Sequence, residues 1–180
     1  MHRPFDRIPY LEGSRIIIRK IEKGDARALD DLRKDGEVYR YLPTFLYEQS
    51  APDVDAVIRD MYGPVFTNRE SILLGIYWKE NQEFSGIAEF YGYRPEVQKI
   101  SLGYRLRKAW WGRGIATETV KLMVDYLYRE TDTQIITASS MVENQASASV
   151  LRKNGFDLVI SGTTEDWGFE RPVIVDKWIR

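Results

Sequence analysis

A glycine turn that leads directly into an amphipathic helix is the feature that most constrains this chain. Gly112 and Gly114 lack a Cβ atom, so the backbone between residues 111 and 117 can turn tightly and bring several N–H groups against a ligand. From Ile115 onward, apolar residues recur at the spacing of a helix with one buried face. Free N–H groups and the positive end of the helix dipole meet at such a helix start, so the stretch predicts an anion site.

Two well-known phosphate-binding loops fit this stretch poorly. A P-loop needs Lys followed by Ser or Thr after its second glycine, and Ile115-Ala116 stands there instead. A dinucleotide-binding turn needs a third glycine where Thr117 stands, and it follows a buried apolar strand, whereas the residues before this turn are polar at every second or third place. A plain strand-to-helix connection, whose glycines only permit close packing, is the structural alternative.

Composition excludes several other kinds of site. Lys and Arg total 26 and Asp and Glu total 27, so no bulk positive charge points to nucleic acid. Cysteine is absent and His2 is the only histidine, which argues against disulfides, thiolate or multi-histidine metal sites, and Cys or Ser-His-Asp catalysis. No apolar run is long enough to span a membrane or to form a signal peptide. We therefore expect a cytoplasmic protein with one domain, residues 1–180, and no metal.

Two motifs together resemble the GNAT N-acetyltransferases. The acyl-CoA loop of that family reads Gln/Arg-x-x-Gly-x-Gly/Ala, and Trp111-Gly-Arg-Gly-Ile-Ala116 is similar to it with Trp in the first place. That form resembles the branch containing the ribosomal-protein and spermidine N-acetyltransferases. Further along, Asn144 to Phe156 is similar to the N-x-x-S-x-x-[VL]-x-x-K-x-G-F block of the same branch. The two blocks stand in the family's order with a predicted strand between them, and a looser resemblance extends over residues 14–180.

Hydrophobic periodicity predicts an α/β order of elements: strand, helices, antiparallel meander, helix, strand, helix, hairpin. The expected strands are 14–20, 71–78, 83–91, 99–106, 134–139, 156–162 and 172–179. The expected helices are 26–34, 50–62, 115 to about 129, and 144–154, the first with Asp25 as its N-cap and the last closed by Gly155. Residues 37–49 are expected to form a weak helix or an ordered loop, and residues 163–171 an exposed loop.

The resemblance implies a more specific fold. It implies a mixed, mostly antiparallel central sheet of about six or seven strands flanked by about four helices. It also implies that its fourth and fifth strands, residues 99–106 and 134–139, run side by side and then splay apart. The pantetheine arm of acetyl-CoA is expected to lie in the gap.

The family further implies direct transfer of acetyl from acetyl-CoA to a primary amine, without an acyl-enzyme. Tyr104 and Leu106 are expected to face the pantetheine through their backbone, and Ser147 and Asn144 are expected further along the cofactor. Asn144 fits the role of a plain helix N-cap equally well. The pyrophosphate is assigned to Trp111, Gly112, Arg113, Gly114, Ile115, Ala116 and Thr117.

Proton transfer is where this chain departs from its relatives. Many members of the branch carry Glu where this chain has Ser101, and other GNAT enzymes use a Tyr where Leu151 stands. Glu89 is the best remaining carboxylate, in a strand expected to border the site, and a solvent-facing strand residue is its alternative role. A water held by Ser101 or Ser139 is the other candidate for the base.

The pKa of the acceptor amine narrows the class of substrate that the enzyme can use. At pH 7, exposing the lone pair of an alkyl amine with a pKa near 10.4 costs about 4 to 5 kcal/mol, whereas an α-amine with a pKa near 8 costs about 1.5 kcal/mol. A weak base therefore favours the α-amine of a peptide or protein N-terminus, or of an amino-acid-like molecule. A polyamine or aminoglycoside-type amine is the alternative acceptor, and a catalytically weak acyl-CoA-binding module is the alternative function.

The expected partners are acetyl-CoA and this amine. Neither nucleic acid nor a membrane is expected, and the resemblance leaves a homodimer open. Residues 37–49 and 163–171 should form the substrate side, with Tyr41, Phe45 and Trp167 as contacts.

Overall fold

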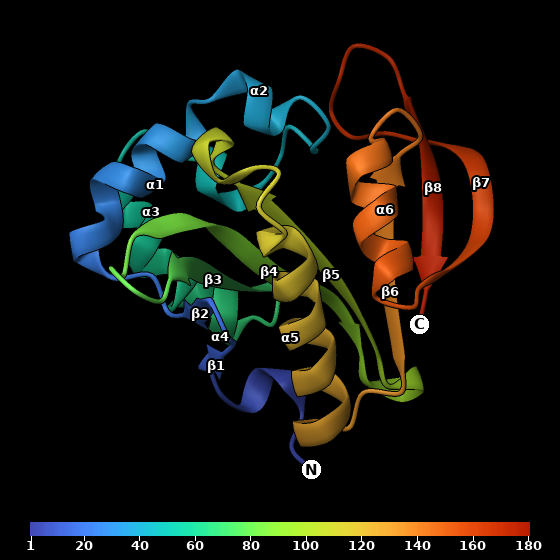
Figure 1. Cartoon of the computed structure of the whole chain (residues 1–180), viewed down its shortest axis with the longest axis horizontal. Coiled ribbons are helices and arrows are strands. Elements are labelled where there is room, and N and C mark those ends of the chain that lie inside the picture. The colour runs from blue at the N-terminus through green and yellow to red at the C-terminus, as the bar shows by residue number, and fades with distance from the viewer.

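The computed structural model describes residues 1–180 and shows an eight-stranded sheet with helices on both faces (Figure 1). The strands are β1 (Leu11–Glu12), β2 (Ile16–Arg19), β3 (Ser71–Trp78), β4 (Phe84–Arg94), β5 (Lys99–Leu106), β6 (Ile135–Met141), β7 (Asp157–Glu165) and β8 (Val173–Ile179). The α-helices are α1 (Ala26–Arg33), α2 (Gly36–Tyr39), α3 (Val54–Met61), α4 (Pro64–Thr67), α5 (Ile115–Glu130) and α6 (Gln145–Lys153).

The sheet order is β1-β2-β3-β4-β5-β6-β8-β7. All neighbouring strands are antiparallel except β5 and β6, which run parallel and are connected through α5. A parallel pair needs such a crossover because the chain must return to the end of the sheet at which the first strand began. The mixed, mostly antiparallel α/β fold expected from the sequence is confirmed.

The central strands separate two apolar cores. Ala88 on β4 and Leu102 on β5 belong to the core covered by α5, which crosses in front of the strands in Figure 1. Ile87 points to the opposite face, because successive side chains alternate along a strand, and it packs in a second core with Leu29 of α1 and Val57 of α3. Each face of these strands is therefore buried under helices.

The sheet opens between β5 and β6. Their pairing is limited to three positions, Lys99 with Ile135, Ile100 with Ile136, and Ser101 with Thr137. Beyond Ser101, β5 continues beside β4 alone, while β6 continues beside β8. The predicted splay is confirmed, and it leaves a gap in the middle of the sheet.

Several details differ from the sequence-based expectations. The sheet has eight strands rather than six or seven, because a short strand, β1, precedes the first predicted one, and two of the six α-helices are single turns. Asp25 occupies the predicted N-cap position of α1, but its side chain makes no capping hydrogen bond, because its carboxylate accepts from Glu22 N at 2.9 Å and Tyr77 Oη at 2.6 Å. Residues 163–171 are not simply an exposed loop, because β7 extends to Glu165 and Trp167 is buried.

Candidate active site

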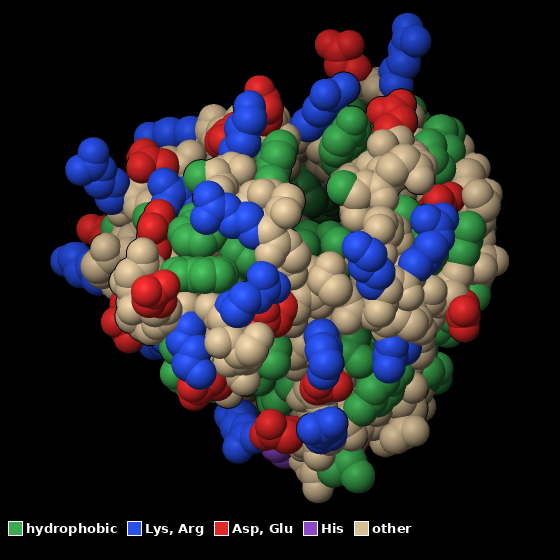
Figure 2. All heavy atoms as spheres, viewed as in Figure 1, with side chains coloured by type: hydrophobic (Ala, Val, Ile, Leu, Met, Phe, Trp, Pro, Cys, Tyr) green, Lys and Arg blue, Asp and Glu red, His purple; other side chains and the backbone are tan.

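A cleft of about 1340 Å³ opens where β5 and β6 separate. Figure 2 shows it as a hollow with hydrophobic side chains in its depth and Lys and Arg side chains around its rim. Its walls come from β4, β5, β6, the glycine turn before α5, helix α6, residues 37–50, and the end of β7 with Trp167. The cleft touches both faces of the sheet, because Tyr104 and Leu106 line it on the α5 face while Glu89 and Ser101 line it on the opposite face.

The glycine turn supplies a row of backbone donors to this cleft. Gly112 and Gly114 have φ angles of 71° and 75°, in the left-handed region that favours glycine. None of the backbone N–H groups from Gly112 to Thr117 donates to another backbone group. Trp111, which begins the turn, donates from Nε1 to Leu106 O at 2.9 Å. The turn thus presents free N–H groups at the N-terminus of a sixteen-residue helix, which suits a pyrophosphate.

A set of hydrogen bonds from the N-terminal part of the chain supports the turn. Arg15 donates from Nη1 to Arg113 O at 2.8 Å and from Nε to Glu118 Oε2 at 2.8 Å. Glu118 also accepts from Arg15 N at 2.8 Å and Ser14 Oγ at 3.0 Å. Burial raises the pKa of the Glu118 carboxyl, but these hydrogen bonds outweigh burial and hold it below its usual value. Arg15 therefore fixes the turn through the Arg113 carbonyl and Glu118, while the N–H groups of the turn stay free.

Helix α6 forms the second wall on the cofactor side. Asn144 is its N-cap, since Oδ1 accepts from Ser147 N at 3.1 Å. Tyr104 of β5 lies against Ser147, and burial raises the pKa of its phenol to about 12, although Ser147 opposes the shift. The phenol is therefore neutral at ordinary pH. Asn144 thus performs the capping role that the sequence left open beside cofactor contact.

The three residues proposed for catalysis lie on one face of the sheet, opposite α5. Ser101 Oγ is 2.8 Å from Thr137 Oγ1, across the last paired position of β5 and β6. Ser139 accepts from Lys177 Nζ at 2.9 Å. Glu89 lies one strand away, opposite Gly103 in the β4–β5 register. Glu89 is not solvent-facing, since it is only 6% exposed and lines the cleft.

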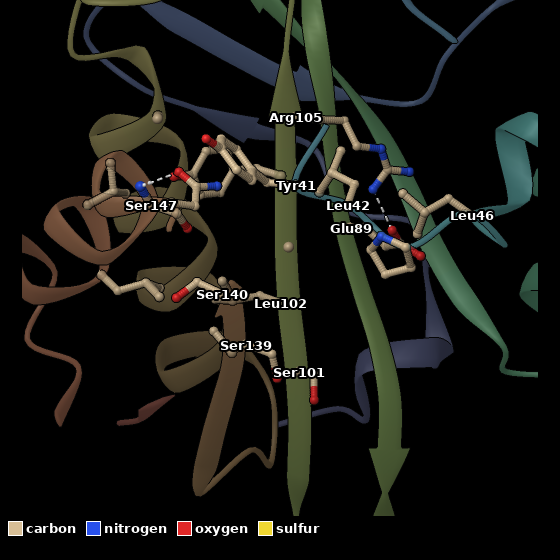
Figure 3. Close-up of a pocket in the computed structure, with 18 of the residues that line it drawn as sticks. Tyr41, Leu42, Leu46, Glu89, Ser101, Leu102, Arg105, Ser139, Ser140 and Ser147 are labelled. Carbon is tan, nitrogen blue, oxygen red and sulfur yellow. Dashed lines mark hydrogen bonds and ion pairs between the residues drawn. The ribbon is translucent and has the colours of Figure 1, made fainter. Parts of the chain in front are cut away.

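Sequence reasoning missed the partner of Glu89. Arg105 reaches Glu89 Oε2 from Nη1 at 2.6 Å, and it reaches Glu48 from Nη2 and Nε, each at 2.6 Å (Figure 3 shows the Glu89 contact). Ser71 Oγ donates to Glu89 at 2.6 Å and Tyr39 Oη donates to Glu48 at 2.7 Å. Burial disfavours the charge on Arg105, but the two carboxylates outweigh burial and raise its pKa.

This charged cluster gave only a weak signal in the sequence. Arg105 alternates with apolar residues of β5, which indicates a polar face but not what lies on it. Glu48 stands in an aromatic-rich segment that lacks strong periodicity. Their contact joins residues 57 positions apart in the chain, and no local pattern encodes it.

Two hydrogen bonds link residues 37–50 to the connection between β7 and β8. Thr44, in the segment between α2 and the 3₁₀ turn Tyr47–Gln49, donates from N to Trp167 O at 2.9 Å and from Oγ1 to the same oxygen at 3.2 Å. Trp167 packs with Met141 and Val175, with Tyr41 against this cluster, and it donates from Nε1 to Glu165 Oε2 at 2.8 Å. Residues 37–50, here called the acceptor wall, therefore contact the β7–β8 connection across the gap.

Comparison with known proteins decides the family. The model of the GNAT acetyltransferase domain matches residues 15–157. The chain belongs to the GNAT acetyltransferase family. A relative from Bacillus licheniformis, named "Uncharacterized N-acetyltransferase p20", is 31% identical over 167 residues, which cover 92% of this chain and 90% of the relative. Another, "Uncharacterized N-acetyltransferase YoaA" of Bacillus subtilis, is 26% identical over 148 residues and covers 82% of each chain.

Solved GNAT structures share the fold at lower identity. The ribosomal L7/L12 α-N-protein acetyltransferase RimL, in complex with coenzyme A, superposes with a TM-score of 0.80 at 18% identity over 96% of this chain and 97% of that one. A spermidine N-acetyltransferase from Vibrio cholerae, in complex with CoA and spermine, gives 0.77 at 16% identity over 93% and 96%. As a GNAT member, the protein is an N-acetyltransferase that uses acetyl-CoA and acts on an amine. None of its helices is long and apolar enough to cross a membrane.

Proposed function

We propose that this GNAT enzyme acetylates an α-amine, either the N-terminus of a peptide or protein or an amino-acid-like molecule. The observation that carries the proposal is the weak base in the acceptor half of the cleft. Ser101 stands where relatives carry Glu, and both oxygens of Glu89 are already engaged by Arg105 and Ser71. An α-amine needs the least help to lose its proton at neutral pH, because its pKa lies about two units below that of an alkyl amine.

On the cofactor side, we assign the pyrophosphate of acetyl-CoA to the turn from Trp111 to Thr117. Its free N–H groups and the dipole of α5 supply hydrogen bonds and partial positive charge. The pantetheine arm would lie along Tyr104 and Leu106, where β5 has lost its β6 partner. Ser147 lies beside Tyr104 and is assigned to the same arm, and Asn144 retains the amide nitrogen for a contact beyond its capping role.

The reaction joins the amine nitrogen to the acetyl carbonyl carbon and breaks the thioester C–S bond. The nitrogen gives up a proton, and the CoA thiolate takes one to leave as a thiol. We assign the first proton to Glu89, directly or through one water. Ser101 and Ser139 lie on the same face and are assigned to hold that water.

The bridge between Thr44 and Trp167 supports an acceptor of narrow shape. It spans the acceptor end of the cleft, so the amine must enter as a flexible chain end or as a small molecule. A lysine in a rigid folded surface would have to displace this contact.

A panel of amines tests the proposal. CoA release should be fastest with short peptides or amino-acid amides that carry a free α-amine, slower with spermidine or an aminoglycoside, and absent with N-blocked peptides. Faster turnover of spermidine at pH 7 would instead favour the polyamine alternative. Tight CoA binding without turnover of any amine would favour the binding module.

A further inference from the structure

We propose that Arg105 is a positioning residue that fixes the acceptor wall, residues 37–50, against the sheet through Glu48. The inference rests on the proposed function, because it takes this wall to be where the amine binds. Arg105 would not touch the reacting atoms. It would set the place of the wall that does meet the substrate.

The contacts of Arg105 connect the acceptor wall to β5 and β4 in the interior, whereas the other ion pair near this wall, Glu37 with Lys108, lies at the surface. Its guanidinium holds Glu48 of the acceptor wall through two nitrogens and Glu89 of β4 through the third, each at 2.6 Å. Tyr39, at the start of the same wall, donates to Glu48 at 2.7 Å. One cation of β5 therefore organises both ends of the wall and the strand that carries the proposed base.

The burial of this cluster indicates that its geometry is fixed. The side chains of Arg105 and Glu48 are 3% and 0% exposed, so water cannot replace a lost partner. Arg105 Nη2 donates to Glu48 Oε2 while Nε lies within ion-pair distance of Oε1, so the planar guanidinium faces both oxygens of that carboxylate and restricts its orientation. Glu48 is thereby held in one place, and with it the 3₁₀ turn Tyr47–Gln49.

The acceptor wall is otherwise anchored by apolar packing of Val38 and Tyr39 in the second core and by Arg33, which donates from Nη1 to Glu48 O at 3.2 Å. Only Gly36–Tyr39 and Tyr47–Gln49 form helical turns, and Phe45 between them is 65% exposed. Thr44 is held by Trp167, which belongs to the other half of the sheet. Without the Arg105–Glu48 link, the wall would keep its apolar packing but lose its register with β5.

The decisive variant is Glu48→Gln, which keeps the shape of the side chain and an acceptor for Tyr39 but removes the ion pair. We expect the amine KM to rise about tenfold or more while the acetyl-CoA KM changes less than about threefold, because only the acceptor side loses its positioning. Arg105→Met should raise the amine KM by at least as much and should also change kcat, because it removes the partner of Glu89. Arg105→Lys should fall between, since an ammonium cannot face both oxygens of a carboxylate in one plane. The double variant Glu48→Gln/Arg105→Met should be no worse than the more severe single, because both break one link.

Arg19→Met is the matched control. Arg19 is also a strand arginine near two carboxylates, Glu22 and Asp25 at 3.8 and 3.9 Å, but it lies outside the cleft. Its loss should leave the amine KM unchanged.

Amide hydrogen exchange gives a readout that needs no substrate. Glu48→Gln should speed exchange in residues 37–50 and leave β3 to β5 protected. Unchanged exchange there, or a lower thermal midpoint with an unchanged amine KM, would overturn the positioning role. Normal kinetics in these variants beside loss of activity in Glu89→Gln would leave the proposed function standing and reject this inference alone.

Discussion

The two halves of the cleft are built in different ways. On the cofactor side, a continuous turn of seven residues presents backbone N–H groups, and glycine conformation is what matters. On the acceptor side, five charged or polar side chains from β3, β4, β5 and residues 37–50 converge, and their contacts depend on long-range packing. The turn that we assign to the co-substrate depends on local backbone geometry, whereas the side that we assign to the acceptor is a surface that only the complete fold assembles.

The largest expected effect on activity comes from a substitution on the acceptor side. Glu89→Gln should lower the acetylation rate by roughly 10² to 10⁴, the usual range for a general base, with little change in CoA affinity. Ser71→Ala is the control, because it removes one hydrogen bond to Glu89 and leaves the carboxylate in place.

The pH profile of kcat/KM identifies the group that titrates in this experiment. A limb that follows the pKa of the amine across two substrates belongs to the substrate, and one that stays belongs to the protein. If Glu89→Gln keeps nearly full activity with an unmoved limb, water held by Ser101 or Ser139 becomes the better account of the base.

The thermal shift caused by CoA binding tests the cofactor side directly. CoA at about a hundred times its dissociation constant should stabilise the fold by about 2.7 kcal/mol, a readily measured rise in thermal midpoint. NAD(H) at the same concentration should give no shift. Absence of a shift with millimolar CoA would contradict the assignment of the turn.

Glycine substitution separates backbone strain from ligand approach. Gly114→Ala places a Cβ 3.2 Å from Arg15 Nη2 at a φ of 75°, so it should weaken CoA binding and also cost about 1 to 3 kcal/mol of stability. Gly112→Ala carries similar strain, at a φ of 71°, but its Cβ meets no atom within 4 Å. Similar CoA affinities in the two variants would show that strain, and not the contact with Arg15, governs the loss.

The smallest effect concerns the support beneath the turn. Because the pKa of Glu118 is held below 4.5 in the folded state, its contribution to stability is present above that pH and lost as the pH falls through the lowered value. Glu118→Gln should therefore flatten the acid side of the stability curve, measured by urea unfolding between about pH 5 and pH 3. An unchanged slope would mean that Arg15 and Ser14 bind the neutral side chain equally well.

The same contrast explains how much the sequence could predict. The glycine turn and α5 were predicted because each depends on residues close together in the chain, whereas Asn144 was left open between an N-cap and a cofactor contact. The limited pairing of β5 and β6 followed from family resemblance rather than from periodicity. Glu48 and Arg105 could not be paired in advance, since alternation identifies a polar strand face without naming its partner. Trp167 was expected to be exposed because no local pattern shows its packing against Met141 and Val175.

The brief contact between β5 and β6 also bears on how the protein unfolds locally. Strands β1 to β5 form a continuous antiparallel set, and β6 to β8 form another, joined in the sheet by only three residue pairs. The two sets share the core under α5, but their backbones pair at only three positions, so we expect amides on the two sides of this seam to exchange with different free energies of opening. A molecule of CoA lying in the seam would contact both sets, so the rarest opening events in either set should become rarer together when it binds. Acetyl-CoA bound between β5 and β6 would then link the two sets of strands, and the lifetime of the protein in the cell would depend on the concentration of its own substrate.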